Sequence, residues 1–377
     1  MKVLHLSLDP SASQPGKQTV FYNMLAEFSN YWDRIDLFCP KTNNGVSRII
    51  HQNVHVHPSP WHFLFQSLFI IYQGRKLVKK RPYDLIILHS CPPFLTDFGA
   101  IILSKFYKIP IIYEVFHIVG YPKSASLLET AYKWMTFFWL KISQSCYHSI
   151  RVINALDTYP VLIHWGIPKH KIKLIPAFYI DSKIFKPRHR EKRLNSVLFV
   201  ARLVRNKGIF ETLTAIKIAR ASIPQIKLTI VGTGSLRNKI IPFISDNKLE
   251  DNIRLIGFLK TQRQLSQLYN RSQALVMTSY NEGGPRVVLE AMACALAVVA
   301  TPVGLVREVI KHKVNGLIVS WDPEDIAQKL VYLLKNKKIS RQMGSQAILS
   351  VKKYPYKKMI RNLAVTYQSL IKSTKIA

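Results

Sequence analysis

Two stretches of the chain start with an apolar run, continue into a polar loop that contains glycine, and end in a helical pattern. The first comprises an expected strand over 3–8, a loop around Gly16 and a helix over 18–28. The second comprises an expected strand over 196–201, a loop over 202–208 and a helix over 210–221. A buried strand that runs into such a loop and helix is typical of a Rossmann-like unit. The pattern therefore predicts two of these units.

Each unit is followed by further short apolar runs that alternate with longer helical segments. We expect strands at 85–88, 109–113, 227–231, 253–256, 274–277 and 297–300. Alternation of this kind predicts parallel sheets with right-handed crossovers, and hence an α/β fold with two doubly wound domains. The join is expected within 186–195, a charged stretch that contains Pro187 and has no apolar periodicity. The first domain would then span 1–187 and the second 188–354.

Length and composition fit this division. A chain of 377 residues, 48% of them apolar, can bury two cores. The four cysteines (Cys39, Cys91, Cys146 and Cys294) form no C-x-x-C pair, which favours a reducing compartment over a disulfide framework. The first residues carry an apolar stretch too short for a signal peptide, and no run is long enough to span a bilayer. We therefore expect a cytoplasmic protein or one that lies on a membrane surface.

The chain is strongly basic, with 54 Lys and Arg against 21 Asp and Glu, a formal net charge of +33. Such an excess attracts polyanions at physiological salt. Nucleic acid, anionic lipid and a phosphorylated substrate all remain candidates at this point.

The most informative segment is residues 279–293, which read SYNEGGPRVVLEAMA. The segment follows a predicted strand, passes through Gly283-Gly284 and enters a helix with Pro285 near its first position, where proline is favoured. A helix that begins behind glycines offers free backbone N–H groups and a positive dipole end, which suits a diphosphate. Glu282 and Glu290 could accept hydrogen bonds from sugar hydroxyls.

Two other loops follow predicted strands of the second domain. Arg202 and Lys207 lie five residues apart before Gly208, a spacing that could clamp a diphosphate. Gly232-Thr233-Gly234 resembles the opening of a dinucleotide fingerprint, but Arg237 stands where the third glycine belongs. The G-x-G therefore indicates a close approach of backbone at the sheet edge rather than an NAD site.

These motifs, in this order, resemble the retaining GT-B glycosyltransferases of family four, often called the group 1 family. The matching segments are FVARLVRNKG, LTIVGTGSL, IRLIGFL, TSYNEGGPRVVLEAMACALAVVATPVG and VNGLIV, across roughly 196–319. The resemblance continues more loosely into the first half through LIILHSCPPF, IPIIYEVFH and KIKLIPAFYIDSKIFKP. It implies two Rossmann-like domains that face each other across a cleft, with a C-terminal helix, 355–377, packing back on the first domain.

The resemblance also implies roles for individual residues. Arg202 and Lys207 would hold the donor diphosphate and stabilise its charge as the glycosidic bond breaks. Glu282 would contact the donor sugar, and His117 would stand at the reacting centre on the acceptor side. The remaining donor contacts would be Glu290 at the ribose, Gly283, Gly284 and Pro285 at the phosphates, Gly257 and Phe258 beside the base, and Gly16 approaching the phosphates from the first domain. Gly232 would leave room for the nucleotide, and Val288 would also belong to the donor site.

The chain departs from the family pattern at several positions. The first-domain loop has one glycine, Gly16, where the family usually has two, and His117 stands one residue from the usual histidine register. Residues 177–179 replace an Asn-Gly turn, and Ala295 and Ala297 replace a Gly and a Pro. No Asp-x-Asp pair occurs in the chain. Together with the two cations and the helix terminus, this predicts a metal-independent enzyme with no cofactor.

Several other features allow two interpretations. His51, His55 and His57 could ligate a metal, although a strand with Val54 and Val56 inward and the histidines outward is favoured. His89 either ends a strand or lines the cleft. The aromatic stretch 61–72, which runs into a basic cluster at 75–81, suits an anionic membrane interface or a buried crossover helix, and a second aromatic stretch, 132–147, is equally ambiguous.

The predicted function is transfer of a sugar from a UDP- or GDP-sugar to the hydroxyl of a sugar or lipid-linked glycan, in surface polysaccharide or glycolipid synthesis. The charge favours peripheral attachment to an anionic membrane. Alternatives are another GT-B enzyme, such as a phosphorylase or a nucleotide-sugar epimerase, a catalytically inactive scaffold, or a protein that binds nucleic acid or anionic membrane through its charge. Specific nucleic-acid binding is not expected, because the chain carries no helix-turn-helix, RNP or zinc pattern.

Overall fold

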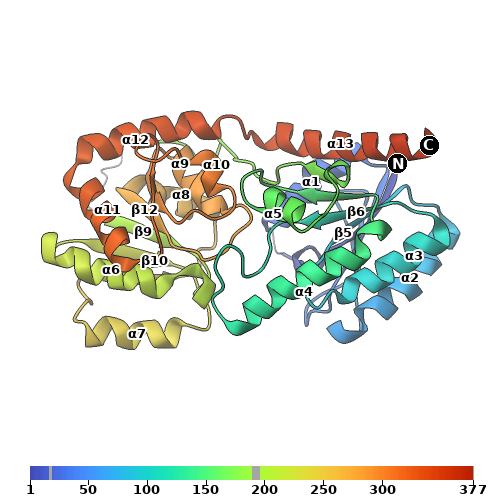
Figure 1. Cartoon of the computed structure of the whole chain (residues 1–377), viewed down its shortest axis with the longest axis horizontal. Helices are drawn as coiled ribbons and strands as arrows, with labels where there is room; N and C mark the ends of the chain where they lie inside the picture. The colour runs from blue at the N-terminus through green and yellow to red at the C-terminus, as the bar shows by residue number, and fades with distance from the viewer. Residues whose placement is uncertain (17–18, 189–195, 377) are drawn as a thin grey trace.

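The computed structural model describes residues 1–16, 19–188 and 196–376. The chain forms two α/β domains that lie side by side along the long axis of the molecule (Figure 1). Most of the expected join, 189–195, lies outside the described residues, as do Lys17 and Gln18, where the first loop was expected to lead into its helix.

The first domain holds an eight-stranded sheet in the order β3-β4-β2-β1-β5-β6-β7-β8, parallel except for the β3–β4 pair. Its strands are β1 Lys2–Leu6, β2 Arg34–Cys39, β3 Arg48–Ile50, β4 Val54–Pro58, β5 Leu85–His89, β6 Ile111–Val115, β7 Ser149–Val152 and β8 Ile172–Leu174. Its helices are α1 Val20–Phe28, α2 Gln66–Lys80, α3 Leu95–Tyr107, α4 Leu127–Ser143 and α5 Thr158–His164.

The second domain holds a six-stranded parallel sheet in the order β11-β10-β9-β12-β13-β14. Its strands are β9 Ser196–Val200, β10 Lys227–Val231, β11 Ile253–Gly257, β12 Ala274–Met277, β13 Ala297–Ala300 and β14 Leu317–Ile318. Its helices are α6 Ile209–Ser222, α7 Arg237–Asp246, α8 Gln262–Arg271, α9 Arg286–Ala293, α10 Val306–Val309, α11 Pro323–Lys335 and α12 Lys337–Val351. Short 3₁₀ turns flank these elements, among them η3 Phe63–Phe65, η4 Gln144–Cys146 and η6 Arg205–Lys207.

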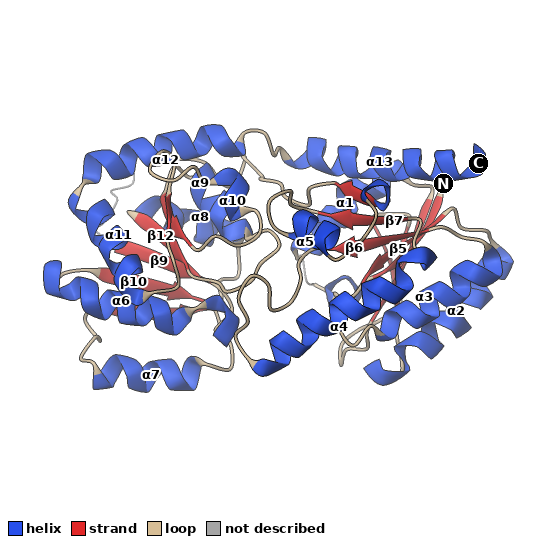
Figure 2. Ribbon diagram, in the orientation of Figure 1, coloured by secondary structure: helices blue, strands red, loops and turns tan. Residues whose placement is uncertain are grey.

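Helices cover both faces of each sheet, as Figure 2 shows. In the first domain, α2, α3 and α4 contribute Phe69, Leu103 and Leu140 to the core on one face. On the other face, α1 contributes Leu25 and Phe28. The strands are apolar on both sides because both sides are buried, as expected for parallel sheets.

The chain crosses between the domains twice, and the two crossings lie against each other. Ile180 pairs with Pro355 in a parallel bridge, with the Ile180 N–H donating to Tyr354 O at 2.9 Å. After this point α13, Tyr356–Ile376, runs along the first domain, where Ile360, Leu363 and Tyr367 pack in the same core as α1. The final helix therefore ties the end of the chain to the first domain (Figure 1).

No helix among the described residues has the length and apolar character needed to cross a bilayer.

Candidate active site

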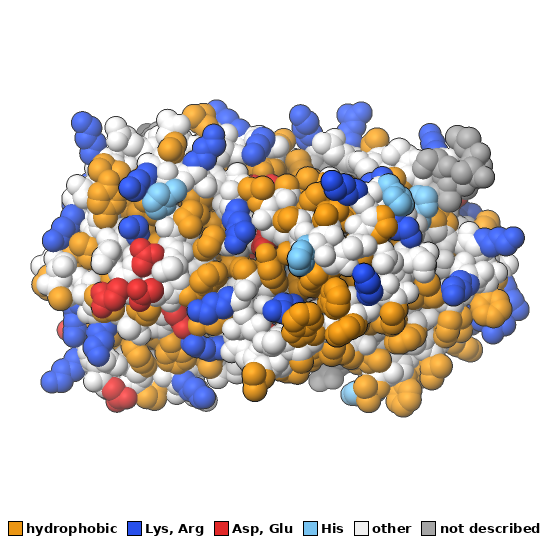
Figure 3. Space-filling model, in the orientation of Figure 1, with side chains coloured by type: hydrophobic (Ala, Val, Ile, Leu, Met, Phe, Trp, Pro, Cys, Tyr) orange, Lys and Arg blue, Asp and Glu red, His pale blue; other side chains and the backbone are white. Residues whose placement is uncertain are grey.

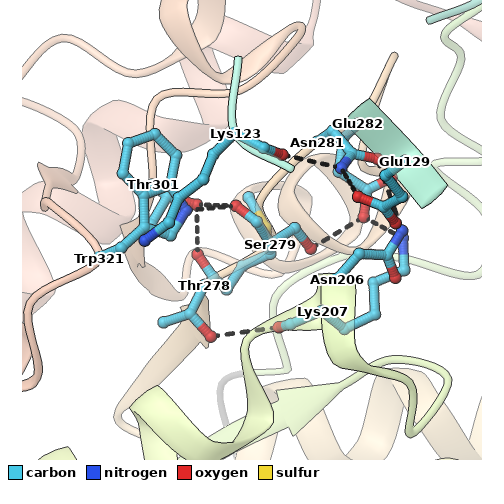
Figure 4. Close-up of polar contacts among 11 residues, drawn as sticks. Lys123, Glu129, Asn206, Lys207, Thr278, Ser279, Asn281, Glu282, Thr301 and Trp321 are labelled. Atoms are coloured by element: carbon cyan, nitrogen blue, oxygen red, sulfur yellow. Dashed lines mark hydrogen bonds and ion pairs between the residues drawn. The ribbon is translucent and has the colours of Figure 1, made fainter. Parts of the chain in front are cut away.

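The predicted donor residues gather where β9 and β12 end at the carboxyl edge of the second sheet. Lys207 lies in η6 after β9, and Glu282 follows β12. The Lys207 Nζ lies 2.5 Å from Glu282 Oε1, and the Ser279 hydroxyl donates to the same oxygen at 2.9 Å (Figure 4). The two side chains thus form an ion pair at the surface that faces the first domain.

Local packing holds Lys207 in place. Gly208 adopts φ +69°, and a Cβ there would clash with the carbonyl oxygen of Thr278. The Thr278 hydroxyl accordingly lies close to the carbonyl oxygens of Gly208 and Lys207, at 2.7 and 3.2 Å. The glycine thus allows the loop after β9 to lie directly on the end of β12, which brings Lys207 to Glu282.

His117 reaches this pair from the first domain, on the loop after β6. The residue keeps exposed surface, and desolvation by the protein packed around the imidazole lowers the pKa of His117 to about 4. The nearby cations Lys207 and Arg202 lower the pKa further, against the opposing effect of Glu282. His117 is therefore neutral at physiological pH and close enough to interact with three of the predicted donor residues.

Phe116, which comes directly before the shifted His117, makes specific contacts at the domain boundary. Phe116 stacks on His89 with ring centroids 4.2 Å apart. The carbonyl oxygen of Phe116 faces Gly283, where a Cβ would clash with it. Gly284 meets the ring of Phe178 in the same way. The two glycines therefore allow the domains to touch, in addition to opening the turn before α9.

Glu290 and Val288, both in α9, are buried. Glu290 is only 5% exposed, accepts a hydrogen bond from the Tyr269 hydroxyl at 3.0 Å and lies 3.7 Å from Arg286 Nη2. Burial raises the pKa of its carboxyl group. Val288 is buried in the core, and its amide donates to Pro285 O. Their roles at the donor therefore stay predictions, and the structure shows that both side chains are enclosed by the second domain.

The remaining donor-side residues line the ends of β9, β10 and β11. Gly232, at φ +146°, lies so close to Ala201 that a Cβ would clash with the Ala201 carbonyl oxygen, and its amide donates to Gly257 O at 2.8 Å. Phe258, next to Gly257, is 79% exposed. Arg202 is exposed, and no carboxylate among the described residues pairs with it.

The structure does not bring the predicted residue Gly16, on the first domain, to this cluster. It adopts φ +76° on an exposed loop, with open space around the position of a Cβ. No hydrogen bond given for the described residues joins it to the second domain.

A set of polar contacts across the domain boundary has no signal in the sequence. Asn281 Nδ2 donates to Lys123 O and to Glu129 Oε2, both at 3.0 Å (Figure 4). The Lys123 ammonium lies over the rings of Tyr280 and Trp321, at 4.5 and 5.1 Å from their centroids. Lys123 and Tyr280 are 157 residues apart in the chain. A local sequence pattern therefore cannot indicate that they are in contact.

A cavity of about 440 Å³ lies beside His117, between the first sheet and helices α1 and α13. Its floor is a row of polar side chains on adjacent strands, with His89 opposite Glu114 and Glu114 opposite Arg151. Its walls are mostly apolar and include Phe21, Met24, Met359 and Leu363. His89 therefore lines the cleft, one of the two alternatives left open above.

The floor of the cavity contains an ion pair with almost no exposure to solvent. Arg151 Nη1 lies 2.5 Å from Glu114 Oε1, and the Tyr367 hydroxyl donates to the same oxygen. His5 is also buried here; its Nδ1 and the Nδ1 of His89 have no hydrogen-bond partner. Burial lowers the pKa of His5 to about 4. Two neutral imidazoles thus face a cavity next to the expected reacting centre.

The two histidines on β4 contact charged side chains of the neighbouring strand β2. His57 Nε2 lies 2.8 Å from Asp36 Oδ1, and His55 Nε2 lies 2.6 Å from Arg34 Nη1. Val54 and Val56 are buried, as the alternating pattern predicted. Within the described ranges, no group of three or more His, Cys, Asp or Glu is arranged to hold a metal ion.

Comparison with known proteins identifies the family. Residues 181–350 match the model of the family described as glycosyl transferases group 1. The chain is 34% identical over 286 residues to the uncharacterized glycosyltransferase MJ1607 of Methanocaldococcus jannaschii, covering 72% of this chain and 71% of that one. The chain belongs to the group 1 glycosyltransferases.

Solved structures show the fold of this glycosyltransferase. Sucrose-phosphate synthase from Thermosynechococcus elongatus superposes with a TM-score of 0.81 at 19% identity, over 99% of both chains. Anabaena Alr3699/HepE in complex with UDP-glucose superposes with a TM-score of 0.74 at 19% identity, over 98% of this chain and 100% of that one. The predicted GT-B fold, with two Rossmann-like domains, is confirmed.

Proposed function

We propose that this glycosyltransferase transfers a sugar from UDP-sugar to a hydroxyl acceptor, with retention of the anomeric configuration and without a metal ion. The observation that carries the proposal is the Lys207–Glu282 pair, which His117 faces from the other domain. UDP is favoured over GDP because the HepE structure, which shares the fold, contains UDP-glucose.

The charges suit departure of a diphosphate. With the donor bound, Lys207 and the unpaired Arg202 would neutralise the negative charge that builds up on the leaving UDP, next to the N-terminus of α9. Glu282 would keep Lys207 oriented and hold a hydroxyl of the donor sugar. These groups supply the neutralisation that a divalent ion would otherwise provide.

Retention follows if the acceptor attacks from the face that UDP leaves. The bond between the anomeric carbon and the diphosphate oxygen breaks, the bond to the acceptor oxygen forms, and the acceptor proton passes to the departing diphosphate. His117 is neutral, so it can hydrogen-bond a sugar or acceptor hydroxyl without adding positive charge to an oxocarbenium-like centre.

The cavity beside His117 is the proposed acceptor site. Its polar floor and apolar walls suit a sugar hydroxyl carried by a partly apolar molecule, such as a lipid-linked glycan. We propose a role in surface polysaccharide or glycolipid synthesis, with the enzyme peripherally attached to the cytoplasmic face of an anionic membrane.

The test is calorimetric titration with UDP, GDP and ADP, each with and without EDTA, on wild type, Lys207→Ala and the matched control Lys217→Ala on α6. We expect selective binding of UDP that EDTA does not change, weakened by Lys207→Ala alone. Hydrolysis of the cognate UDP-sugar should fall by about 10²- to 10³-fold in Lys207→Ala, since one group that stabilises the leaving charge is lost. Equal binding of all three nucleotides, or loss of binding in EDTA, would overturn the proposal.

The rival GT-B chemistries give different products. A transferase releases UDP in proportion to the glycoside formed, whereas a phosphorylase consumes phosphate and an epimerase returns an isomeric UDP-sugar. The anomeric proton coupling of the glycoside, read by NMR, then reports retention or inversion.

A further inference from the structure

Helix α2 and the preceding turn η3 present an apolar stripe to solvent. One stripe of the helix, including Phe69 and Ile70, is buried in the core. On the opposite side Leu64, Phe65 and Leu68 are all more than half exposed. A crossover helix that served only the core would carry polar residues on its outer side.

Exposed apolar side chains also form stripes on the two neighbouring helices, α3 and α4. On α3, Phe98, Ile102 and Phe106 recur every fourth residue, so they form one stripe, and Phe106 is 80% exposed. On α4, Trp134, Phe138 and Ile142 recur in the same way, and Ile142 is 72% exposed.

The three helices pack into one surface. Gly99 of α3 lies against the backbone of Ser67 in α2, and Gly74 of α2 lies against Leu103 of α3. Trp139 of α4 contacts Phe98 of α3, with ring centroids 4.9 Å apart. Hydrophobic side chains gather over these helices at the lower right of the molecule in Figure 3. We call the exposed apolar side chains of η3, α2, α3 and α4 the α2–α4 face.

The charges around this face have one sign. Exposed cations lie on all three helices: Arg75, Lys76, Lys79 and Lys80 on α2, Lys105 on α3 and Lys141 on α4. Of the two carboxylates on these helices, Asp97 is fully buried and Glu129 bonds to Asn281 at the domain boundary. The α2–α4 face therefore has apolar side chains and cations but no exposed carboxylate of its own.

We propose that the α2–α4 face is the surface by which the enzyme docks on an anionic lipid bilayer. The apolar stripes would enter the boundary between headgroups and acyl chains, and the cations would contact lipid phosphates. A groove lined by Trp61, Tyr72, Arg75 and Lys79 places aromatic rings next to cations, an arrangement suited to the depth of the headgroups. This assigns residues to the membrane partner in the proposed function.

The face belongs to the first domain alone, which leaves the second domain free to move during donor exchange. It also lies on the opposite side of the sheet from the acceptor cavity, because α2, α3 and α4 cover one face of the sheet and α1 and α13 the other. Docking would therefore leave the cavity uncovered.

The proposal is tested by sedimentation of the full-length protein with vesicles, one set of phosphatidylcholine alone and one containing phosphatidylglycerol. We expect binding only to the anionic vesicles, weakened at least about tenfold when exposed apolar side chains of the face are replaced. The face variant is Phe65→Ser/Leu68→Ser/Phe106→Ser, and its control with exposed apolar positions of the second domain is Ile241→Ser/Val314→Ser/Leu349→Ser.

A second pair of variants separates the face from the overall charge. Both variants lower the net charge equally, but only one changes the face: Lys76→Glu/Lys79→Glu/Lys105→Glu against Lys217→Glu/Lys335→Glu/Lys338→Glu. We expect the first to lose binding and the second to retain most of it. Equal losses would show adsorption through net charge alone and would overturn the proposal.

Insertion of the face into the bilayer can be detected by tryptophan fluorescence. Trp134 lies on the face and Trp61 in the groove beside it, so brominated lipids should quench part of the tryptophan fluorescence, and Trp61→Phe/Trp134→Phe should remove that part. Binding without quenching would overturn the inserted arrangement. Self-association that disappears in the face variant, with no vesicle binding, would assign the face to a second copy of the chain instead. UDP titration of each variant without vesicles separates these outcomes from a failure of the proposed function, because the face variants should bind UDP like wild type.

Discussion

The two domains of this glycosyltransferase place their chemical groups in different ways. In the second domain, the donor-side groups stand on short loops directly after strands, with Lys207 after β9 and Glu282 after β12. In the first domain, most of the polar groups that line the cavity stand on the strands themselves, and they come from distant parts of the chain. His5 and Tyr367, at opposite ends of the sequence, share one cavity wall.

This difference fits the ligand that we propose for each domain, a diphosphate for the second and an acceptor for the first. A diphosphate is met by cations, amides and a helix end, which a contiguous strand-loop-helix segment can supply. An acceptor of mixed polarity requires a shaped cavity, and a cavity is bounded by elements that meet only after folding. The donor side can therefore be recognised from sequence motifs, whereas the acceptor side cannot.

The largest expected effect on stability concerns the buried ion pair of the first domain, under the cavity. Replacing Arg151 by Met leaves Glu114 charged and without its cation in the core, so we expect a loss of about 3–5 kcal/mol in the free energy of unfolding of the first domain. Five of the six tryptophans (32, 61, 134, 139 and 165) belong to that domain, so the unfolding midpoint in urea can be followed by their fluorescence.

Two variants serve as controls for this prediction. The exposed Arg263→Met on α8 should change stability by less than about 0.5 kcal/mol. The double variant Arg151→Met/Glu114→Leu should recover much of the loss, because it removes the uncompensated charge. No recovery would mean that the hydrogen bonds of Arg151 to Ile175 and Pro176 matter more than the pair.

A second contrast is acid sensitivity. His5 has its pKa lowered from 6.5 to about 4 by burial, so the unfolded chain binds its proton first as pH falls. The stability that neutral His5 contributes should be complete above pH 6.5 and be lost between about pH 6.5 and 4, by roughly 2–3 kcal/mol. In the second domain, the only histidine within the described ranges, His312, is exposed.

Unfolding midpoints at pH 7 and pH 4.5 check this expectation. His5→Asn, which does not titrate in this range, should flatten the pH dependence, whereas His312→Asn should leave it unchanged. An unaltered slope in His5→Asn would assign the acid sensitivity to the other histidines of this site whose pKa is lowered, His89 and His117.

The smallest expected effect concerns the contact between the domains. Gly283→Ala would place a methyl group against the Phe116 carbonyl oxygen and hold the domains apart while keeping the amide at position 283. We expect transfer to fall by roughly 10- to 100-fold, as a displacement on the scale of 1 Å does elsewhere, with UDP affinity nearly unchanged. Gly316→Ala, away from the domain boundary, is the control. A parallel loss of UDP affinity would show that the glycine serves the donor rather than closure.

The fold was predicted where apolar runs were uninterrupted. The expected strand at 227–231 coincides with β10, and the one at 274–277 with β12. The pattern did not single out β2, whose alternation includes Arg34 and Asp36. Those charges are tolerated in a buried strand because His57 and Tyr83, from other segments, hydrogen-bond Asp36. For the same reason β7, with Arg151 at its centre, was missed.

The site was predicted to a similar extent. The sequence placed Lys207 and Glu282 on strand-end loops, and the structure brings them within 2.5 Å of each other. It gave no indication of Lys123 or Asn281, since their contact joins two domains. The aromatic stretches 61–72 and 132–147 were ambiguous between membrane and core, because periodicity reports that a helix has an apolar side but not whether a neighbour covers it.

The sequence by itself determined the two α/β domains, their order and the donor-side motifs. These depend on backbone geometry and on residues close together in the chain, so the information is local. Only the tertiary structure decided that His117 lies near Lys207, that Glu290 and Val288 are buried, and that three helices leave apolar stripes in solvent. Each of these is a matter of burial or pairing between distant segments, and the free energy of such contacts depends on which surfaces meet when the domains pack.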